Sequence, residues 1–198
     1  MRGMRAGARE SDEVSLYPLF LKLDGLRVLV VGAGAVAERK VMSLLAAGAR
    51  LRVVAPRATE KIRRLAQEGT VEWEARPFED ADIEGNWLVI ASTSDAELQR
   101  RVAAAAAPRR IFVVAVDDPA HASAYSGAVV RRTPFTIAVS SSGATPALTR
   151  LVREIIEQVL PSTEWVEHAK RLRAKWLAEG TPTGDRFAEL VKTIKERS

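Results

Sequence analysis

The chain of 198 residues has no cysteine and only two histidines, His121 and His168. Without cysteine there are no disulfides, no thiolate catalysis and no zinc or iron–sulfur site held by cysteine. Two histidines are too few for a multi-histidine metal site within one chain, so we expect no resident metal. His168 falls on the polar side of an expected helix, and we assign it no role.

Long apolar runs are also missing. No stretch approaches the roughly 20 apolar residues that cross a bilayer. Residues 1–15 are polar and contain arginine, and they lack the apolar centre of a signal peptide. We therefore expect a flexible tail over 1–15, a cytoplasmic location and no membrane partner.

Charge of one sign is not concentrated in any segment. The 30 basic residues are scattered among 25 acidic ones and leave a net charge of +5. A basic protein attracts polyanions, but the chain has neither a Lys/Arg block nor a row of aromatic residues suited to nucleic acid. We expect no nucleic-acid partner, because a small ligand with several carboxylates suits the charge equally well.

Short apolar runs alternate with helical patterns up to residue 118. Strands are expected at 26–31, 51–54, 71–75, 87–91 and 111–116, and helices between them ending near Ala47, at 58–67 and at 95–107. This alternation predicts an α/β fold with a Rossmann-type, doubly wound parallel sheet and right-handed crossovers. We assign a nucleotide-binding domain to 16–118.

The pattern changes after residue 118. Segments 127–132 and 135–140, separated by Thr133-Pro134, predict an antiparallel pair of strands, and a helix should run over 146–160 until Pro161 stops it. Two amphipathic stripes follow, and they predict short helices that must pack on the rest of the chain or on another subunit. We therefore expect a small β-containing segment (119–160) and a helical C-terminal region (161–198).

The motif Gly32-x-Gly34-x-x-Ala37 lies between an expected strand and an expected helix. Gly32 permits a tight turn, Gly34 lets the backbone approach a pyrophosphate, and Ala37 keeps helix and strand close. A glycine turn without a ligand is the alternative. We predict that the ends of three strands bind a dinucleotide, through Gly32, Gly34, Ala35, Val36, Ala55, Pro56, Ser92 and Thr93.

The second expected strand is not followed by the acidic residue that would bind a ribose 2′-hydroxyl. Arg57 stands there instead. Its guanidinium could accept the 2′-phosphate of NADP, or it could simply be solvated. NAD is the expected cofactor, and NADP is not excluded.

The sequence Asp117-Asp118-Pro119 follows the last parallel strand. Ligands of open α/β sheets bind outside these strand ends, and successive side chains alternate in direction, so one of the two aspartates should face the crevice. A carboxylate there could accept a proton while a hydride leaves a carbon acid. A turn before proline is the alternative. His121 is expected to be an exposed loop residue.

Small residues precede the helix expected at 146–160. Thr145 suits the N-cap and Pro146 the first helical position, and the residues before them could expose backbone amides to an anion. Arg150 and Arg153 could present two guanidinium groups to carboxylates. An ordinary capped helix with a solvated charged face is the alternative.

Four motifs in this order resemble precorrin-2 dehydrogenase, the module also found at the N-terminus of siroheme synthase: Leu16–Phe20, Val31–Lys40, Ile111–Pro119 and Val139–Arg150. The resemblance implies NAD-dependent oxidation of precorrin-2 to sirohydrochlorin. In some members the same site then inserts ferrous iron, so iron is a possible second substrate, and whether this chain chelates stays open. It also implies a homodimer whose contact lies in 119–160.

The same resemblance places the family's essential aspartate on Asp117 and the serine of its Ser-Ser-Gly segment on Ser141. It implies that the carboxylates of a tetrapyrrole bind to Ser141, Ser142, Gly143, Thr145 and Arg150. Ser142 stands where members usually have glycine. A non-catalytic dinucleotide-sensing domain is the alternative function, although such domains typically have the ribose-binding acid that is missing here.

Overall fold

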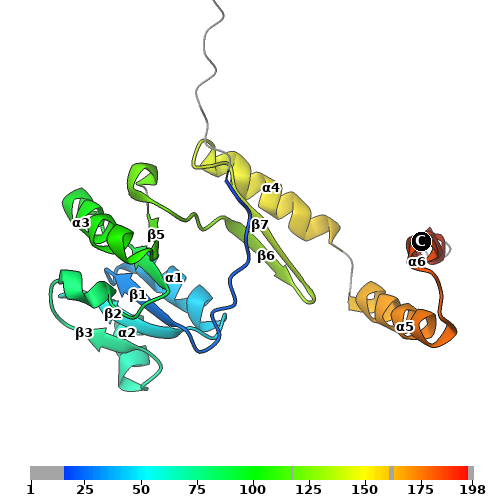
Figure 1. Cartoon of the computed structure of the whole chain (residues 1–198), viewed down its shortest axis with the longest axis horizontal. Helices are drawn as coiled ribbons and strands as arrows, with labels where there is room; N and C mark the ends of the chain where they lie inside the picture. The colour runs from blue at the N-terminus through cyan, green and yellow to red at the C-terminus, as the bar shows by residue number, and fades with distance from the viewer. Residues whose placement is uncertain (1–15, 117, 161–162, 196–198) are drawn as a thin grey trace, which may run out of the picture. The chain divides into compact units, whose positions relative to one another are not determined.

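The computed structural model describes residues 16–116, 118–160 and 163–195 (Figure 1). They form two compact units, divided between Tyr125 and Ser126. The tail expected over 1–15 and the aspartate at position 117 lie outside the described residues.

The first unit is built on a five-stranded parallel sheet in the order β3-β2-β1-β4-β5. Its strands are β1 (Arg27–Val31), β2 (Arg50–Val54), β3 (Glu72–Glu74), β4 (Leu88–Ala91) and β5 (Phe112–Ala115). The chain moves outward from β1 through β2 to β3, then returns to the other side of β1 for β4 and β5. The predicted Rossmann-type sheet is confirmed. Its topological switch point lies between β1 and β4, where ligands of such sheets bind.

Helices cover both faces of the sheet. They are α1 (Ala35–Leu45), α2 (Glu60–Gln67) and α3 (Ala96–Ala106), with short 3₁₀ turns η1 (Asp80–Ile83), η2 (Ala107–Arg109) and η3 (Pro119–His121). Val28 and Val30 belong to a core with residues of α1 and α2, whereas Leu29 and Val31 belong to a core with residues of α3 and η1. Because the two central strands are buried on both sides, Val28–Val31 of β1 and Leu88–Ala91 of β4 are all apolar.

The expected element boundaries hold to within about two residues, which is the usual uncertainty of helix ends. The second helix begins at Glu60 rather than at Ala58, because the Thr59 hydroxyl accepts a hydrogen bond from the backbone N–H of Ile62 and caps the helix there. The loop between β3 and β4 contains η1. The described helices include none that is long and apolar enough to cross a membrane.

The second unit contains the expected antiparallel pair, β6 (Ala128–Arg132) and β7 (Phe135–Val139), followed by α4 (Pro146–Val159). Val130 is fully buried in this unit. An Arg132 guanidinium nitrogen donates to the backbone carbonyl of Leu160 at 2.8 Å, which ties the end of β6 to the residue after α4.

Two helices close the chain, α5 (Thr163–Glu179) and α6 (Thr183–Lys195). The Trp176 indole N–H donates to Glu189 at 2.6 Å and joins them. The polar placement of His168 was wrong: the imidazole is buried beside Trp165, with their rings at a T-shaped angle. Trp165, His168, Leu172 and Trp176 follow helical spacing and share one face of α5, which is buried or half-buried. The apolar Leu177, one residue further, is exposed.

Candidate functional site

Gly32 and Gly34 have different structural roles at the end of β1. Gly32 has φ +101°, and a Cβ there would lie 2.1 Å from the backbone oxygen of Ser92, so only glycine fits between β1 and the end of β4. Gly34 occupies the N-cap position of α1, and a Cβ on it would meet no atom within 4 Å. Gly34 is therefore not needed for packing within the described chain, and its open side is free for a ligand.

The N-terminus of α1 is open to an anion. Gly34 has no side chain that could cap the helix, and Gly34, Ala35 and Val36 are exposed. Ala37, one residue further, is completely buried against the sheet, as predicted for close packing of helix and strand. The first backbone N–H groups of α1 and the positive end of its dipole thus suit a phosphate group.

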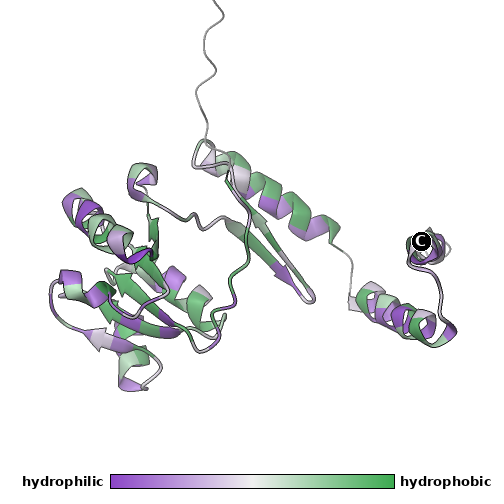
Figure 2. Ribbon diagram, in the orientation of Figure 1, coloured by the Kyte–Doolittle hydropathy of each residue, from purple (hydrophilic) through white to green (hydrophobic). Residues whose placement is uncertain are grey.

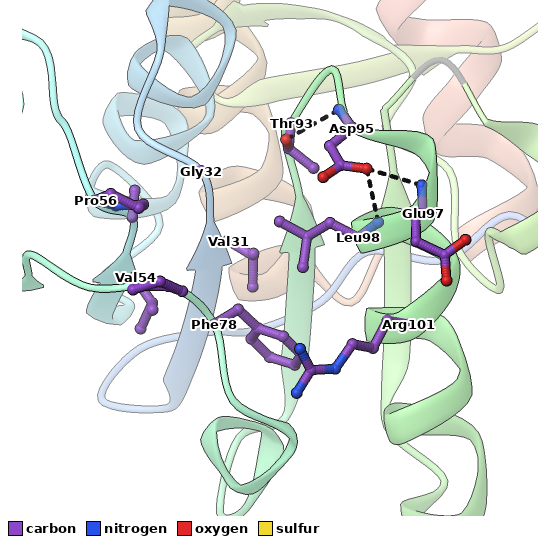
Figure 3. A pocket seen from close by; sticks show the side chains of 12 residues that line it. Val31, Gly32, Val54, Pro56, Phe78, Thr93, Asp95, Glu97, Leu98 and Arg101 are labelled. Carbon is purple, nitrogen blue, oxygen red and sulfur yellow. Dashed lines mark hydrogen bonds between the residues drawn. The ribbon is translucent and has the colours of Figure 1, made fainter.

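A cavity of about 390 Å³ lies at the carboxyl ends of the central strands (Figure 3). Its lining includes four of the eight residues predicted to bind the cofactor, Gly32, Ala55, Pro56 and Thr93, but not Gly34, Ala35, Val36 or Ser92. The hydroxyl of Ser92 beside it is buried without a hydrogen-bond partner among the described residues. Arg57, two residues beyond Ala55, is exposed and forms no hydrogen bond or ion pair with the described residues.

The outer wall of this cavity was not predicted. Phe78 and Arg101 line it, and the Arg101 guanidinium lies 5.5 Å from the centre of the Phe78 ring while its Nε donates to Asp80 at 2.7 Å. Figure 3 shows the ring and the guanidinium side by side. Sequence patterns could not reveal this wall, because Phe78 lies outside any periodic element and Arg101 reads as an ordinary exposed helix residue.

A buried carboxylate holds the loop that carries Phe78. Asp82 is 4% exposed and accepts hydrogen bonds from Arg52 at 3.0 Å and from Arg76 at 2.6 Å. Burial by itself would raise the pKa of Asp82. The bonds from Arg76 and from the Glu79 backbone N–H, with the charges of both arginines, together hold that pKa below its usual value.

Replacing Asp82 by asparagine should lower the free energy of unfolding by about 2 kcal/mol, because the partly buried guanidinium groups of Arg52 and Arg76 each lose one of their two carboxylate partners and keep only Glu74. The pKa of Asp82 is lowered by folding, so its contribution is present above the unfolded pKa of about 4 and is lost as the pH falls through the folded value. Urea denaturation at neutral and acid pH measures both effects. The difference between variant and wild type should shrink in acid.

The matched control is Asp80→Asn, which removes an exposed partner of Arg101 and should cost under about 1 kcal/mol. Equal losses for the two variants at neutral pH would show that the Asp82 network has no special structural role.

The aspartate pair after β5 is described only in part. The Oδ2 of Asp118 accepts a hydrogen bond from His121 Nδ1 at 2.7 Å. His121 is exposed, as expected of a loop histidine. Asp118 is therefore engaged by a local side chain. The candidate proton acceptor, Asp117, lies outside the described residues, and its role stays a prediction.

The segment Ser140–Thr145 forms a compact turn before α4. Ser142 and Gly143 both have positive φ, 53° and 85°. This conformation favours glycine, so Ser142 is strained there. The Ser141 hydroxyl accepts from the backbone N–H of Thr145 at 3.2 Å and from the Thr149 hydroxyl at 2.7 Å.

Two expectations for the start of α4 have different outcomes. Pro146 occupies the first helical turn, as predicted. Thr145 is at the N-cap position, but its side chain makes no capping hydrogen bond, because its backbone has φ −140° and ψ 73° rather than the usual cap geometry. Arg150 and Arg153 pair with Glu154 of the same helix, and the hydrogen bond from Arg150 lowers the pKa of that carboxyl.

The described residues fit a dinucleotide. The uncapped start of α1 beside the open side of Gly34 supplies N–H donors for a phosphate, and the unpartnered Ser92 hydroxyl lies just after the end of β4. The cavity at the switch point has room for an adenosine.

Comparison with known proteins supports a domain that binds a nicotinamide dinucleotide. The model of a family described as putative NAD(P)-binding matches residues 19–128, and that of the sirohaem biosynthesis protein central family matches residues 132–158. Siroheme synthase of Pseudomonas aeruginosa is 47% identical over 150 residues, which are 76% of this chain and 32% of that protein. Siroheme synthase of Photorhabdus laumondii is 40% identical over 159 residues, 80% of this chain and 33% of that protein.

Among solved structures, SirC, a precorrin-2 dehydrogenase, superposes with a TM-score of 0.70 and 21% identity, covering 91% of this chain and 100% of that one. This likeness supports the fold. The chain spans about a third of the length of the siroheme synthases that it matches. Since the first family model covers more than half of its residues, the chain belongs to the putative NAD(P)-binding family and is a relative of the siroheme synthases.

Proposed function

We propose that the chain catalyses the NAD-dependent oxidation of precorrin-2 to sirohydrochlorin in siroheme biosynthesis. The main support is the dinucleotide cradle at Gly32–Val36, because it opens at the carboxyl edge of the sheet. At this edge β5 ends with Ala115, and Asp117 follows two residues later in the sequence. The similarity to siroheme synthases supplies the substrate class.

In this mechanism precorrin-2 loses one hydride and one proton. A bound nicotinamide dinucleotide supplies the hydride acceptor. The N–H groups at the start of α1, from Gly34 to Val36, bind its pyrophosphate, and Ser92 and Thr93 bind its nucleoside portion at the end of β4. The carboxylate of Asp117 accepts the proton as general base.

The tetrapyrrole carboxylates are proposed to bind to Ser141, Ser142, Gly143, Thr145 and Arg150. The backbone N–H groups of Ser142, Ala144 and Thr145 donate within the turn, to Ser140 Oγ, the Ser141 carbonyl and Ser141 Oγ. Among the described residues of this turn, the Gly143 N–H is therefore the backbone donor proposed for a substrate carboxylate. The Arg150 side chain is largely exposed and is held only by an ion pair within its own helix, so it can exchange Glu154 for a substrate carboxylate.

NAD is the proposed cofactor, and we propose that Arg57 sets the affinity for NADP by binding its 2′-phosphate. No acidic residue lies between the end of β2 and Thr59 to repel a 2′-phosphate, and the Arg57 guanidinium is exposed and unengaged by the described residues. The chain should therefore accept NADP more readily than a Rossmann enzyme with a ribose-binding acid.

Ferrous iron would act as a substrate that is passed to the tetrapyrrole. The described residues contain no cluster of three or more His, Asp or Glu side chains that could hold a metal ion. The pyrrole nitrogens would then be the iron ligands, and Asp117 the group that accepts their protons.

We also propose a homodimer formed through α4. Four apolar side chains project to solvent at helical spacing, Leu148, Leu151, Ile155 and Val159, and each is at least half exposed. Figure 2 shows the apolar residues along this helix. An exposed apolar stripe of this length is typical of a contact surface, and a two-fold axis would pair it with itself.

Replacing both Leu151 and Ile155 by glutamate should convert the dimer to monomer, with a dissociation constant raised at least about 100-fold, because charges would be buried in an apolar contact. Sedimentation equilibrium measures this shift. The control is Glu157→Gln, an exposed polar position on the opposite face of the same helix. A double variant that sediments like the wild type would contradict the proposed contact.

Anaerobic incubation with precorrin-2 and either NAD or NADP, followed by absorbance, tests the proposed activity. Sirohydrochlorin should form with NAD, and adding ferrous ion shows whether siroheme then accumulates. Dinucleotide binding without any oxidation of precorrin-2 would refute the proposal and favour a dinucleotide sensor.

A further inference from the structure

The Gln99 side chain is buried in α3 and joins the ends of two strands. It is 5% exposed, and its Nε2 donates to the backbone carbonyl of Thr93 at 2.7 Å and to that of Val116 at 2.9 Å. Sequence patterns gave Gln99 no role, because a glutamine in a surface helix usually faces solvent.

These two carbonyls lie where β4 and β5 have stopped pairing. The register of the two strands ends at Ala91 and Ala115, and one further backbone bond follows, from Val116 N–H to the Ala91 carbonyl at 3.0 Å. Beyond that point the Gln99 carboxamide bridges the two chain segments. Thr93 lines the cavity of the candidate site, and Val116 immediately precedes Asp117 in the sequence.

The bridge needs a primary amide at this position. Two carbonyl acceptors must share one nitrogen with two hydrogens, which glutamine and asparagine have and glutamate and leucine lack. The start of α3 is itself fixed, because the Asp95 carboxylate accepts from the backbone N–H groups of Glu97 and Leu98. The helix thus holds the amide at a set place relative to the strand ends.

We propose that Gln99 is a positioning residue that fixes Val116, at the exit of β5, relative to Thr93 at the cofactor-binding end of β4. The inference rests on the proposed function. Gln99 contacts neither substrate nor cofactor, and its effect comes through the carbonyls of Thr93 and Val116. A small displacement of a reacting group costs up to about 100-fold in rate. Dinucleotide binding should change less, because Gln99 touches only the backbone carbonyl of Thr93, and the proposed pyrophosphate site at the start of α1 is not among its contacts.

Gln99→Leu and Gln99→Glu test this, with turnover normalised to titrated NAD-binding sites so that only folded protein is counted. Gln99→Leu should lower kcat at least about tenfold, while KM for precorrin-2 and Kd for NAD change less than about threefold. In Gln99→Glu, burial raises the pKa of the new carboxyl. Its protonated form can donate one hydrogen bond, so its kcat relative to Gln99→Leu should rise as the pH falls.

The control for a merely structural role is Ile62→Val, which loses one buried methyl group in α2. It should lower the melting temperature without changing kcat per binding site. If the Gln99 variants behave like Ile62→Val, Gln99 only stabilises the fold and the inference fails. A wild-type protein that does not oxidise precorrin-2 at all would overturn the proposed function and this inference with it.

Discussion

Replacing Asp117 by asparagine should slow precorrin-2 oxidation at least about 100-fold and leave dinucleotide binding unchanged. Asparagine has the same shape as aspartate but cannot accept the proton that leaves with the hydride, and loss of a general base costs about 10²–10⁴-fold in rate. Single-turnover absorbance under anaerobic conditions gives the rate of oxidation, and fluorescence titration gives Kd for NAD. The phosphate-binding residues at Gly34–Val36 precede this position by about eighty residues in the sequence and lie on α1, so binding should not change.

The neighbouring Asp118 provides a matched control. Its carboxylate pairs with His121 at 2.7 Å, so Asp118→Asn removes a local contact and should change the rate less than about threefold. If Asp117→Asn turns over like the wild type, or if Asp118→Asn is the slow variant, the assignment of the proton acceptor is wrong.

Alanine at Gly32 and alanine at Gly34 should give opposite results for stability and binding. At Gly32 a Cβ would lie 2.1 Å from the Ser92 oxygen, at a φ of +101°. We expect Gly32→Ala to cost at least about 3 kcal/mol, since it combines a steric clash with a left-handed backbone. At Gly34 a Cβ meets nothing, so Gly34→Ala should fold normally, and it should weaken NAD binding at least about tenfold because the methyl group occupies the space of the pyrophosphate.

Thermal unfolding and NAD titration on the two variants separate these effects. A Gly34→Ala protein that binds NAD as tightly as the wild type would show that the pyrophosphate does not lie at the start of α1. A Gly32→Ala protein of normal stability would contradict the close approach of β1 and β4.

The parallel sheet was predictable because its strands are buried on both faces. Residues Val28–Val31 and Leu88–Ala91 must all be apolar, and such runs stand out between helical patterns. The glycine motif was predictable for the same reason, since it joins one of these strands to a helix whose Ala37 is fully buried.

The hydrogen bonds that hold the loops around the site were not predictable, because they join residues that no local sequence pattern connects. Arg52 and Asp82 are 30 positions apart, and Gln99 and Val116 are 17 apart. A polar residue that is buried by such a contact looks like any surface residue in the sequence. The His168 assignment failed in the same way, because a histidine counts as polar in a helical pattern although its ring is large enough to pack in a core.

The amounts of NADH and sirohydrochlorin formed together in one anaerobic turnover are the most direct measurement. If nucleotide and macrocycle meet at the carboxyl edge of this sheet, both products appear in equal amounts and at the same rate. Saturating NAD binding with precorrin-2 left unoxidised would contradict the account.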